Sequence, residues 1–214
     1  MKSFIIVAAL LSSLITKGQV STLLGVELTG AYLTNKTRLA KTGFSDQLGF
    51  GAQVNLRIGL GREERMSMKI GAGYLYRSIN GELLSFTSTG NDEIQLHITR
   101  QYLSNELLFG YHAIAERDSR LIISIGGSSL LLLDEQQDNS RGIVLVTSTT
   151  TEPDIAIGGK ASIAYERSLG RSGLALRTSA GYTHFFDDVE YADMLQLTIG
   201  VLWELQGGND RGLF

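Results

Sequence analysis

The clearest pattern in the chain is the alternation of apolar and polar residues over Gln47–Leu60, which reads QLGFGAQVNLRIGL. Successive side chains of a β-strand point to opposite faces, so the even-numbered positions from Leu48 to Leu60 form one wholly apolar face. The other face carries glycines, amides and a single charge, at Arg57. The exposed face of a soluble sheet is normally more densely polar than this. The segment therefore predicts a strand of a small membrane barrel, with lipid against the apolar face and a narrow lumen behind it.

The same alternation recurs along the chain and predicts eight strands. They are expected at Ser21–Leu33, Gln47–Leu60, a strand from Met66 onward, Glu93–Ala113, Leu121–Leu133, Ile155–Arg167, Leu174–Phe186 and Met194–Leu205. Short turns follow the second, fourth and sixth strands, and longer segments follow most of the others, an arrangement typical of membrane barrels. We therefore predict an all-β fold: an eight-stranded antiparallel up-and-down transmembrane β-barrel.

Two irregularities are expected near the middle of the chain. The third strand should continue past the bilayer into a hairpin around Thr89–Asp92. In the returning strand, the apolar positions are even up to Ile98 and odd from Leu103 onward. One extra residue reverses the faces of a strand, so this change predicts a bulge near Arg100–Tyr102. The longest loop is expected at Asp134–Asp154.

The polar face of the predicted strands carries many of the glycines together with charged residues of both signs. Glycines leave room in a lumen for long charged side chains from neighbouring strands. Charges in a closed interior are costly unless they neutralise one another, so these residues should form a lumen ion-pair network. Its predicted members are Glu27, Arg57, Lys69, Arg77, Glu106, Lys160, Glu166, Arg177 and Glu204.

The aromatic residues of the apolar faces sort into two bands when odd-numbered strands ascend and even-numbered strands descend. One band comprises Tyr32, Phe50, Tyr74, Tyr76 and Tyr182, and the other comprises Phe109, Tyr111, Tyr165 and Trp203. Aromatic rings favour both interfaces of a bilayer, so two bands fit a membrane barrel. The alternative is a soluble lipocalin-like binding barrel with the apolar faces inside. So many large side chains would overfill the interior of eight strands.

The N-terminus has the pattern of a secretory signal peptide over residues 1–18. Lys2 precedes the apolar run Phe4–Ile15, and Thr16-Lys17-Gly18 predicts a cleavage site before Gln19. The signal contains two of the 19 basic residues and none of the 22 acidic ones, so the exported chain carries a formal charge of −5. This charge argues against nucleic acid as a partner. The chain has no cysteine, so its stability must come from closed hydrogen bonding rather than disulfides.

A signal ending at Gly18-Gln19, eight strands and polar outer loops resemble outer-membrane β-barrel domains of the OmpA/OmpX-like and PorT-like type, common in Bacteroidetes. The resemblance covers residues 19–205, followed by a polar tail at 206–214. It implies an integral outer-membrane location, with outer-membrane lipid and lipopolysaccharide as its surroundings. The segment Thr198–Leu205 is similar to the last-strand signal that the barrel-assembly machinery recognises. The residues that match this assembly signal are Thr198, Gly200, Trp203 and Leu205.

Candidate chemistry is sparse. The three histidines, His97, His112 and His184, show no paired metal-ligand spacing and no hydrolase motif. Some eight-stranded barrels are lipid A deacylases or acyltransferases with a His–Ser pair, which makes His184 the best enzymatic candidate. Those deacylases have a serine two residues after the histidine, where this chain has Phe186, although Ser179 lies nearby in sequence.

The acidic residues of the predicted last loop are a second candidate site. Carboxylate oxygens are ligands that Ca²⁺ prefers, but the loop lacks the glycine-punctuated spacing of a calcium loop. A solvated loop is therefore the interpretation we prefer. The residues concerned are Asp187, Asp188, Glu190 and Asp193.

These observations predict a non-enzymatic, monomeric barrel that is integral to the outer membrane and has no cofactor or metal. It is expected to act as a structural component or through its outer loops. Two alternatives stay open: a lipid-modifying outer-membrane enzyme and a soluble lipocalin-like binding barrel.

Overall fold

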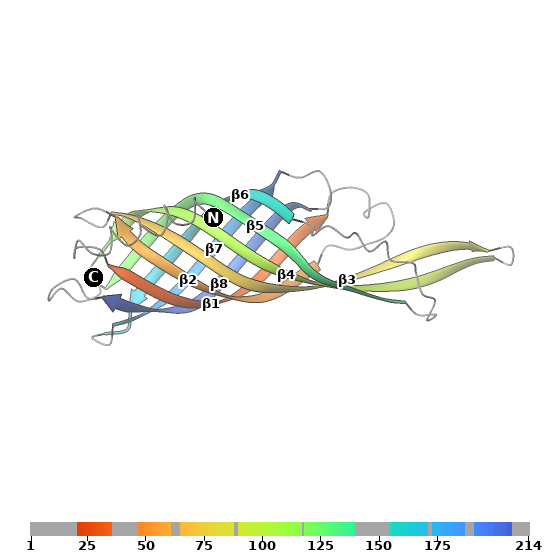
Figure 1. Cartoon of the computed structure of the whole chain (residues 1–214), viewed down its shortest axis with the longest axis horizontal. Helices are drawn as coiled ribbons and strands as arrows, with labels where there is room; N and C mark the ends of the chain where they lie inside the picture. Colours follow the sequence, from red (N-terminus) through yellow and green to blue (C-terminus); the bar gives the residue numbers. More distant parts are fainter. Residues whose placement is uncertain are drawn as a thin grey trace, which may run out of the picture.

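The computed structural model describes residues 21–35, 47–60, 65–87, 90–116, 118–139, 155–170, 173–186 and 191–206. Each strand pairs antiparallel with the next, and β1 pairs with β8, so the sheet closes into a barrel (Figure 1). The predicted fold class is confirmed. The strands are β1 (Thr22–Asn35), β2 (Gln47–Leu60), β3 (Met66–Thr87), β4 (Gly90–Ala115), β5 (Ser119–Asn139), β6 (Ile155–Ser168), β7 (Leu174–Phe185) and β8 (Tyr191–Gln206).

The two ends of the barrel differ in their connections. At one end, here called the turn end, Thr22 of β1 pairs with Gln206 of β8, and β2–β3, β4–β5 and β6–β7 are joined by short connections. The opposite end, here called the loop end, holds the β1–β2, β3–β4, β5–β6 and β7–β8 connections. The expected signal peptide and residues 207–214 of the expected tail lie outside the described residues. No helix that could cross a membrane occurs in the described part of the chain.

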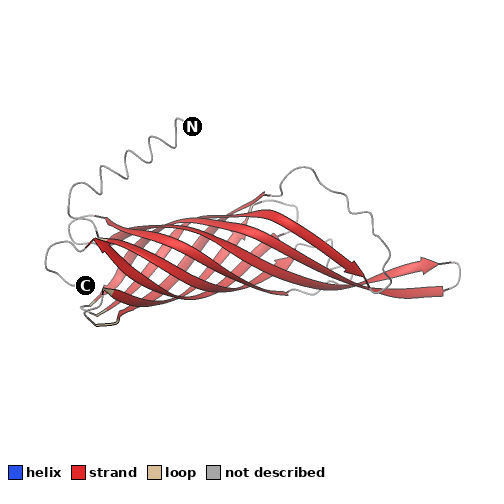
Figure 2. Cartoon of the chain, turned by 60° about the horizontal axis from the view of Figure 1, so that its bottom comes forward, coloured by secondary structure: helices blue, strands red, loops and turns tan. Residues whose placement is uncertain are grey.

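β4, β5 and β8 are each several residues longer than the sequence pattern predicts, and β3 continues past the bilayer as expected. β3 and β4 pair continuously up to Thr87 opposite Gly90, so Gly90 and the residues after it belong to β4 rather than to the expected hairpin turn. β5 continues past Leu133 and pairs with β4 up to Asn139 opposite Leu96, which shortens the expected loop. The hairpin of β3 and β4 therefore projects from the loop end, far beyond the other strands (Figures 1 and 2).

The expected bulge occurs at the predicted level but in the neighbouring strand. Gln101 of β4 pairs with Asp134, whereas Tyr102 pairs with Leu132, so the extra residue is Leu133 of β5. The pairing of β4 with β3 runs without a shift. β4 therefore keeps its even-numbered side chains on the inner face, and Ile98, expected to face lipid, is only 4% exposed. The apolar pattern of β4 indicates that an irregularity is present, but it does not show which of the two paired strands contains the additional residue.

The faces of the strands are arranged as in a membrane barrel. Large apolar side chains cover the outside, and they include Phe50 at 64% and Leu197 at 69% exposure. Charged side chains from β1, β2, β3, β4, β6 and β7 are buried inside, among them Glu27, Arg57 and Glu166. A soluble barrel requires the opposite arrangement, so the lipocalin-like alternative is wrong.

The aromatic residues on the outer surface lie in two bands. Near the loop end, Phe50 pairs with Tyr76, and Leu195 lies between Tyr32 and Tyr182 in the ladder. Near the turn end, Tyr165 pairs with Leu121 and Trp203 pairs with Leu174. The bands flank an apolar zone, as the girdles of membrane barrels do.

Inward glycines allow close approach of neighbouring strands. A Cβ on Gly126 would lie 2.0 Å from the Leu107 carbonyl oxygen, and one on Gly51 would lie 2.2 Å from that of Tyr74. Gly30, at an outward position of β1, would meet nothing within 4 Å. The inner glycines are therefore required by the curvature of the sheet, and they also leave lumen space for charged side chains.

Val54 tests the outward assignment, because it lies in the middle of β2 on the outer face and is half exposed. Val54→Arg should lower the free energy of unfolding by about 2–4 kcal/mol, since it places a charge against hydrocarbon. Val54→Leu should be accepted by fluid lipid. Both variants are measured by urea unfolding in lipid vesicles. If Val54→Leu instead costs about 1–3 kcal/mol, this face is a close-packed core.

Candidate functional site

The lumen is occupied by a network of buried charged side chains. At one side of it, Glu166 of β6 accepts hydrogen bonds from two guanidinium groups. Arg177 Nη1 of β7 lies 2.6 Å from Glu166 Oε1, and Arg57 Nη1 of β2 donates to the same oxygen. Glu166 is fully buried, so its charge is compensated by these cations rather than by water.

Glu27 of β1 connects the arginines to a lysine. Arg177 Nε lies 3.0 Å from Glu27 Oε1. Lys69 Nζ of β3 lies 2.8 Å from Glu27 Oε2 and 2.8 Å from Glu106 Oε1 of β4, so one ammonium group joins two carboxylates. Glu27, like Glu166, has no exposed surface.

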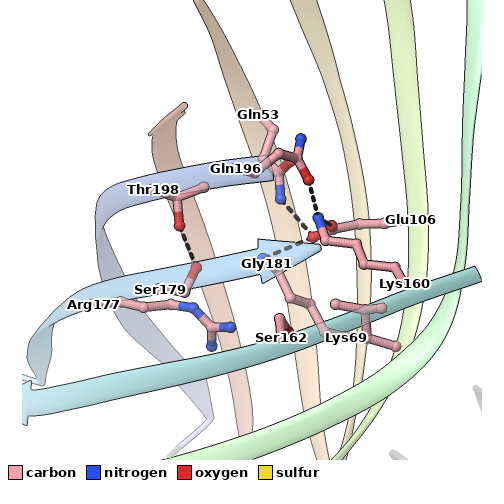
Figure 3. Close-up of a pocket in the computed structure, with 11 residues that line it drawn as sticks. Gln53, Lys69, Glu106, Lys160, Ser162, Arg177, Ser179, Gly181, Gln196 and Thr198 are labelled. Carbon is pink, nitrogen blue, oxygen red and sulfur yellow. Dashed lines mark hydrogen bonds and ion pairs between the residues drawn. The ribbon is translucent and has the colours of Figure 1, made fainter. Parts of the chain in front are cut away.

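Lys160 of β6 and two glutamines complete the network. Lys160 Nζ lies 2.6 Å from Glu106 Oε2 and 2.5 Å from Gln196 Oε1 of β8. Gln53 Nε2 of β2 donates to Glu106 Oε1 at 2.7 Å and to Glu27 Oε2 at 3.3 Å. Figure 3 shows these side chains converging from strands on opposite sides of the barrel. The cations and anions alternate along the whole series of contacts, so each carboxylate lies beside at least two cations.

Seven of the nine residues expected in the network are joined by these contacts. Arg77 is also fully buried and points inward, but it lies nearer the loop end, opposite Gly49 and Arg100. Glu204 is half-buried near the turn end, where its backbone N–H donates to the Gly173 carbonyl at 3.1 Å. Eight of the nine are buried, and they span more than one level of the barrel.

The sequence pattern did not identify the two glutamines or the ion pair of Arg100 with Glu135, in which Nε and Oε2 are 2.6 Å apart. Gln53 could have been found, since it occupies an odd position of β2 between the predicted inward residues. Glu135 could not, because its segment was expected to be a loop. The network is therefore larger than a search for alternating charges suggests.

Apolar side chains close the lumen on both sides of the charges. Toward the turn end, Leu23, Ala175 and Leu202 pack together. The space left among the charges is a cavity of about 10 Å³, which is room for roughly one water molecule. The described residues therefore leave no wide aqueous channel. The larger apolar cluster, toward the loop end, contains Ala31, Leu33, Leu75, Tyr102, Leu130, Ala156, Phe185 and Met194.

Comparison with solved structures identifies the type of fold. The chain is similar to the outer membrane protein OprG from Pseudomonas aeruginosa, with a TM-score of 0.52 and 10% identity over 88% of this chain and 97% of that chain. The chain has the fold of a bacterial outer-membrane β-barrel. The resemblance stated from the sequence is confirmed at the level of fold. No family model and no curated protein matches the chain.

Two further structures of outer-membrane barrels match more loosely. Neisserial surface protein A has a TM-score of 0.49 and 8% identity, over 86% of this chain and 98% of that chain. Ail of Yersinia pestis, solved with the heparin analogue sucrose octasulfate, has a TM-score of 0.47 and 6% identity, over 87% and 99%. Each match covers nearly the whole length of the solved chain.

The residues of the expected assembly signal lie on both faces of the barrel. Thr198 points inward and shares a hydrogen bond with Ser179. Gly200 is buried, and a Cβ there would lie 2.4 Å from the Val26 carbonyl oxygen. Trp203 is half-buried and Leu205 is exposed, both near the turn end. Gly200 therefore has a packing role of its own, next to the network residue Glu27.

The enzymatic candidates are separated by the sheet. His184 points outward, where its Nδ1 lies 2.9 Å from Asp193 Oδ1, and Tyr182 Oη donates to the same oxygen at 2.5 Å. Ser179 points inward and bonds Thr198. Residues five apart on a strand lie on opposite faces, so Ser179 and His184 do not form a catalytic pair. Phe186, in the position where deacylases carry serine, lies edge-on to the His184 ring.

The other candidate sites are not joined into a metal centre. His112 Nε2 lies 3.2 Å from Ser67 Oγ inside the barrel, and His97 Nε2 lies 3.4 Å from Ser78 Oγ. Among the described residues there is no group of three or more side chains that could hold a metal ion. Asp187, Asp188 and Glu190 of the acidic loop lie outside the described residues, so the solvated loop expected there stays a prediction.

Glu166→Gln tests the network, because it keeps the shape of the side chain but removes the charge that compensates Arg57 and Arg177. We expect a loss of about 3–5 kcal/mol in the free energy of unfolding, the usual cost of breaking a buried ion pair. Urea unfolding in lipid vesicles measures it. Glu116→Gln, in an exposed turn, is the matched control and should leave stability nearly unchanged. Equal stability of the two variants would show that the lumen is hydrated enough to solvate the arginines.

Proposed function

We propose that the chain is a monomeric, non-enzymatic barrel integral to the outer membrane, exported by residues 1–18, that acts through the segments projecting from its loop end. The observation that carries this proposal is the pairing of an apolar outer surface with a closed, charge-filled lumen. An outer surface of this kind requires lipid. A lumen closed by ion pairs and apolar clusters leaves no path for a solute.

In the membrane, the turn end faces the periplasm and the loop end faces outward. Short turns on the periplasmic side and longer outer segments are the usual arrangement in outer-membrane barrels. The band containing Tyr32, Phe50 and Tyr76 then contacts lipopolysaccharide, and the band containing Tyr165 and Trp203 contacts phospholipid. The projecting segments of β3, β4 and β5 lie outside the cell, where they can meet partners.

The competing function is a lipid-modifying enzyme, and the contact of His184 with Asp193 is the feature that favours it. The pair faces outward in the lipopolysaccharide band, as such an enzyme requires. The two candidates weighed for a nucleophile do not serve: among the described residues, Ser179 is inside the barrel and Phe186 occupies the adjacent outward position. We therefore interpret His184 as a residue that links β7 to β8 at the loop end. Release of acyl chains from lipopolysaccharide by the purified protein would reverse this interpretation.

The membrane assignment predicts the behaviour of the full chain in a Gram-negative host. The protein should be found in the outer-membrane fraction, resist extraction by high salt, and change its mobility on a gel only after boiling, because a closed barrel stays folded in cold detergent. A form lacking residues 1–18 is the control and should stay in the cytoplasm. Extraction of the full chain by high salt alone would contradict the proposal.

Assembly by the barrel-assembly machinery gives a separate prediction at the last strand. Trp203→Leu should lower the amount of barrel inserted in cells, because Trp203 is the aromatic residue of the proposed signal, while refolding into lipid in vitro should change little. Tyr165→Leu is the matched control, since Tyr165 lies in the same aromatic band on β6. Yields are measured by immunoblot of outer-membrane fractions. If both variants insert equally well, the signal lies elsewhere, for example at Phe214.

A further inference from the structure

The projecting hairpin has a long edge with no paired strand among the described residues. β2 pairs with β3 only up to Gly49 opposite Arg77. β3 continues to Thr87, and over Ser78–Thr87 its described neighbour is β4 alone. In Figures 1 and 2 this part of β3 forms one side of the ribbon that extends away from the barrel. An exposed strand edge of this kind is a template for pairing with another chain.

The hydrogen-bonding pattern identifies which backbone groups face that edge. The His112 N–H donates to the Arg65 carbonyl at 2.9 Å, so these two opposed residues form a hydrogen-bonded pair. Such pairs recur at every second residue of an antiparallel ladder, and the β3–β4 register has no shift. Odd-numbered residues of β3 therefore bond β4. The backbone N–H and C=O groups that point to the other edge belong to Asn80, Glu82, Leu84 and Phe86.

The opposite edge of the ribbon is shorter, because β5 covers β4 up to the pair Leu96–Asn139. Beyond that point the ribbon has two strands only. A two-stranded ribbon is marginally stable in water, and a third strand with further hydrogen bonds stabilises it. The edge of β3 is thus the better site for an added strand.

Charge indicates what kind of strand fits. Between Ser78 and Thr99 the sequence contains Glu82, Asp92 and Glu93 but no lysine or arginine. The projecting end of β5 adds Asp134 and Asp138, while Glu135 there is paired with Arg100. A second copy of the chain would bring two acidic ribbons together, and like charges across a strand pair are destabilising. A basic segment is attracted instead.

We propose that the edge of β3 at Asn80–Phe86 binds a basic, extended peptide segment of another protein by strand addition. The backbone of the segment forms an antiparallel or parallel ladder with β3, and its cations are balanced by the acids of the ribbon. This inference rests on the proposed function, since the ribbon must project outside the membrane.

The test uses the full mature chain, folded in detergent micelles, and a labelled probe peptide of about twelve alternating lysine and threonine residues, long enough to span a strand. Binding is followed by fluorescence anisotropy. A control peptide of the same sequence carries N-methyl groups at every second residue, which removes the donors of one edge but keeps the charge. We expect the unmodified peptide to bind at least about tenfold more tightly than the methylated one. Equal binding of the two would mean attraction by charge alone and would overturn the proposal.

Variants of Leu84 test the same edge from the protein side. Leu84→Pro removes a donor that faces the free edge and is compatible with an edge strand, whereas Leu84→Ala keeps the donor. We expect Leu84→Pro to weaken peptide binding by about tenfold or more and Leu84→Ala to have little effect. Unchanged binding by a folded Leu84→Pro protein would overturn the proposal, and if this variant does not fold, the methylated peptide still decides.

Two further results separate this inference from the proposed function. A heat-modifiable protein in the outer-membrane fraction that fails to bind the basic peptide contradicts only the strand-addition site. The mass of the protein in micelles gives its oligomeric state. A dimer that is lost on Leu84→Pro substitution would assign the edge to a second copy and overturn the choice of partner.

Discussion

The structure depends on the neutralisation of charge inside a closed sheet. Glu27 and Glu166 are fully buried, and a buried carboxylate without a counter-charge is unstable. The arrangement is possible because the cations reach them from several strands at once: Arg177 touches both carboxylates, and Lys69 joins Glu27 to Glu106. The network therefore connects strands that are not neighbours in the sheet and resists flattening of the barrel. Close approach at inner glycines such as Gly51 makes room for it.

The apolar outer surface follows from the burial of the charged side chains inside the barrel. With the charges inside, the remaining face of every strand can be apolar, and a lipid bilayer accepts such a surface where water does not. Backbone groups within the bilayer need partners, and the pairing of β1 with β8 removes the edges that an open sheet would leave. Closure, lumen charge and lipid contact are thus one connected set of requirements.

Outside the barrel these requirements no longer apply. β3 and β4 continue as a ribbon without a lumen on one side or lipid on the other, and the backbone edge that closure eliminates in the membrane returns there. The acids that the sequence concentrates there oppose the pairing of two such edges, since like charges across a strand pair are destabilising. The strands β3 and β4 therefore contribute both to the closed barrel and to a ribbon beyond it.

The sequence by itself determined the number of strands, the limits of β2, and which residues of β2 face the lumen, because the two-residue period of a strand is a local property. Only the tertiary structure decided which inward residues meet: Glu166 contacts Arg57 and Arg177 because closure and tilt bring β6, β7 and β2 to one level. The extra residue Leu133 and the extension of β5 to Asn139 were likewise decided by pairing with β4. The register between strands depends on interactions between residues distant in sequence, so the alternation within one strand does not predict it.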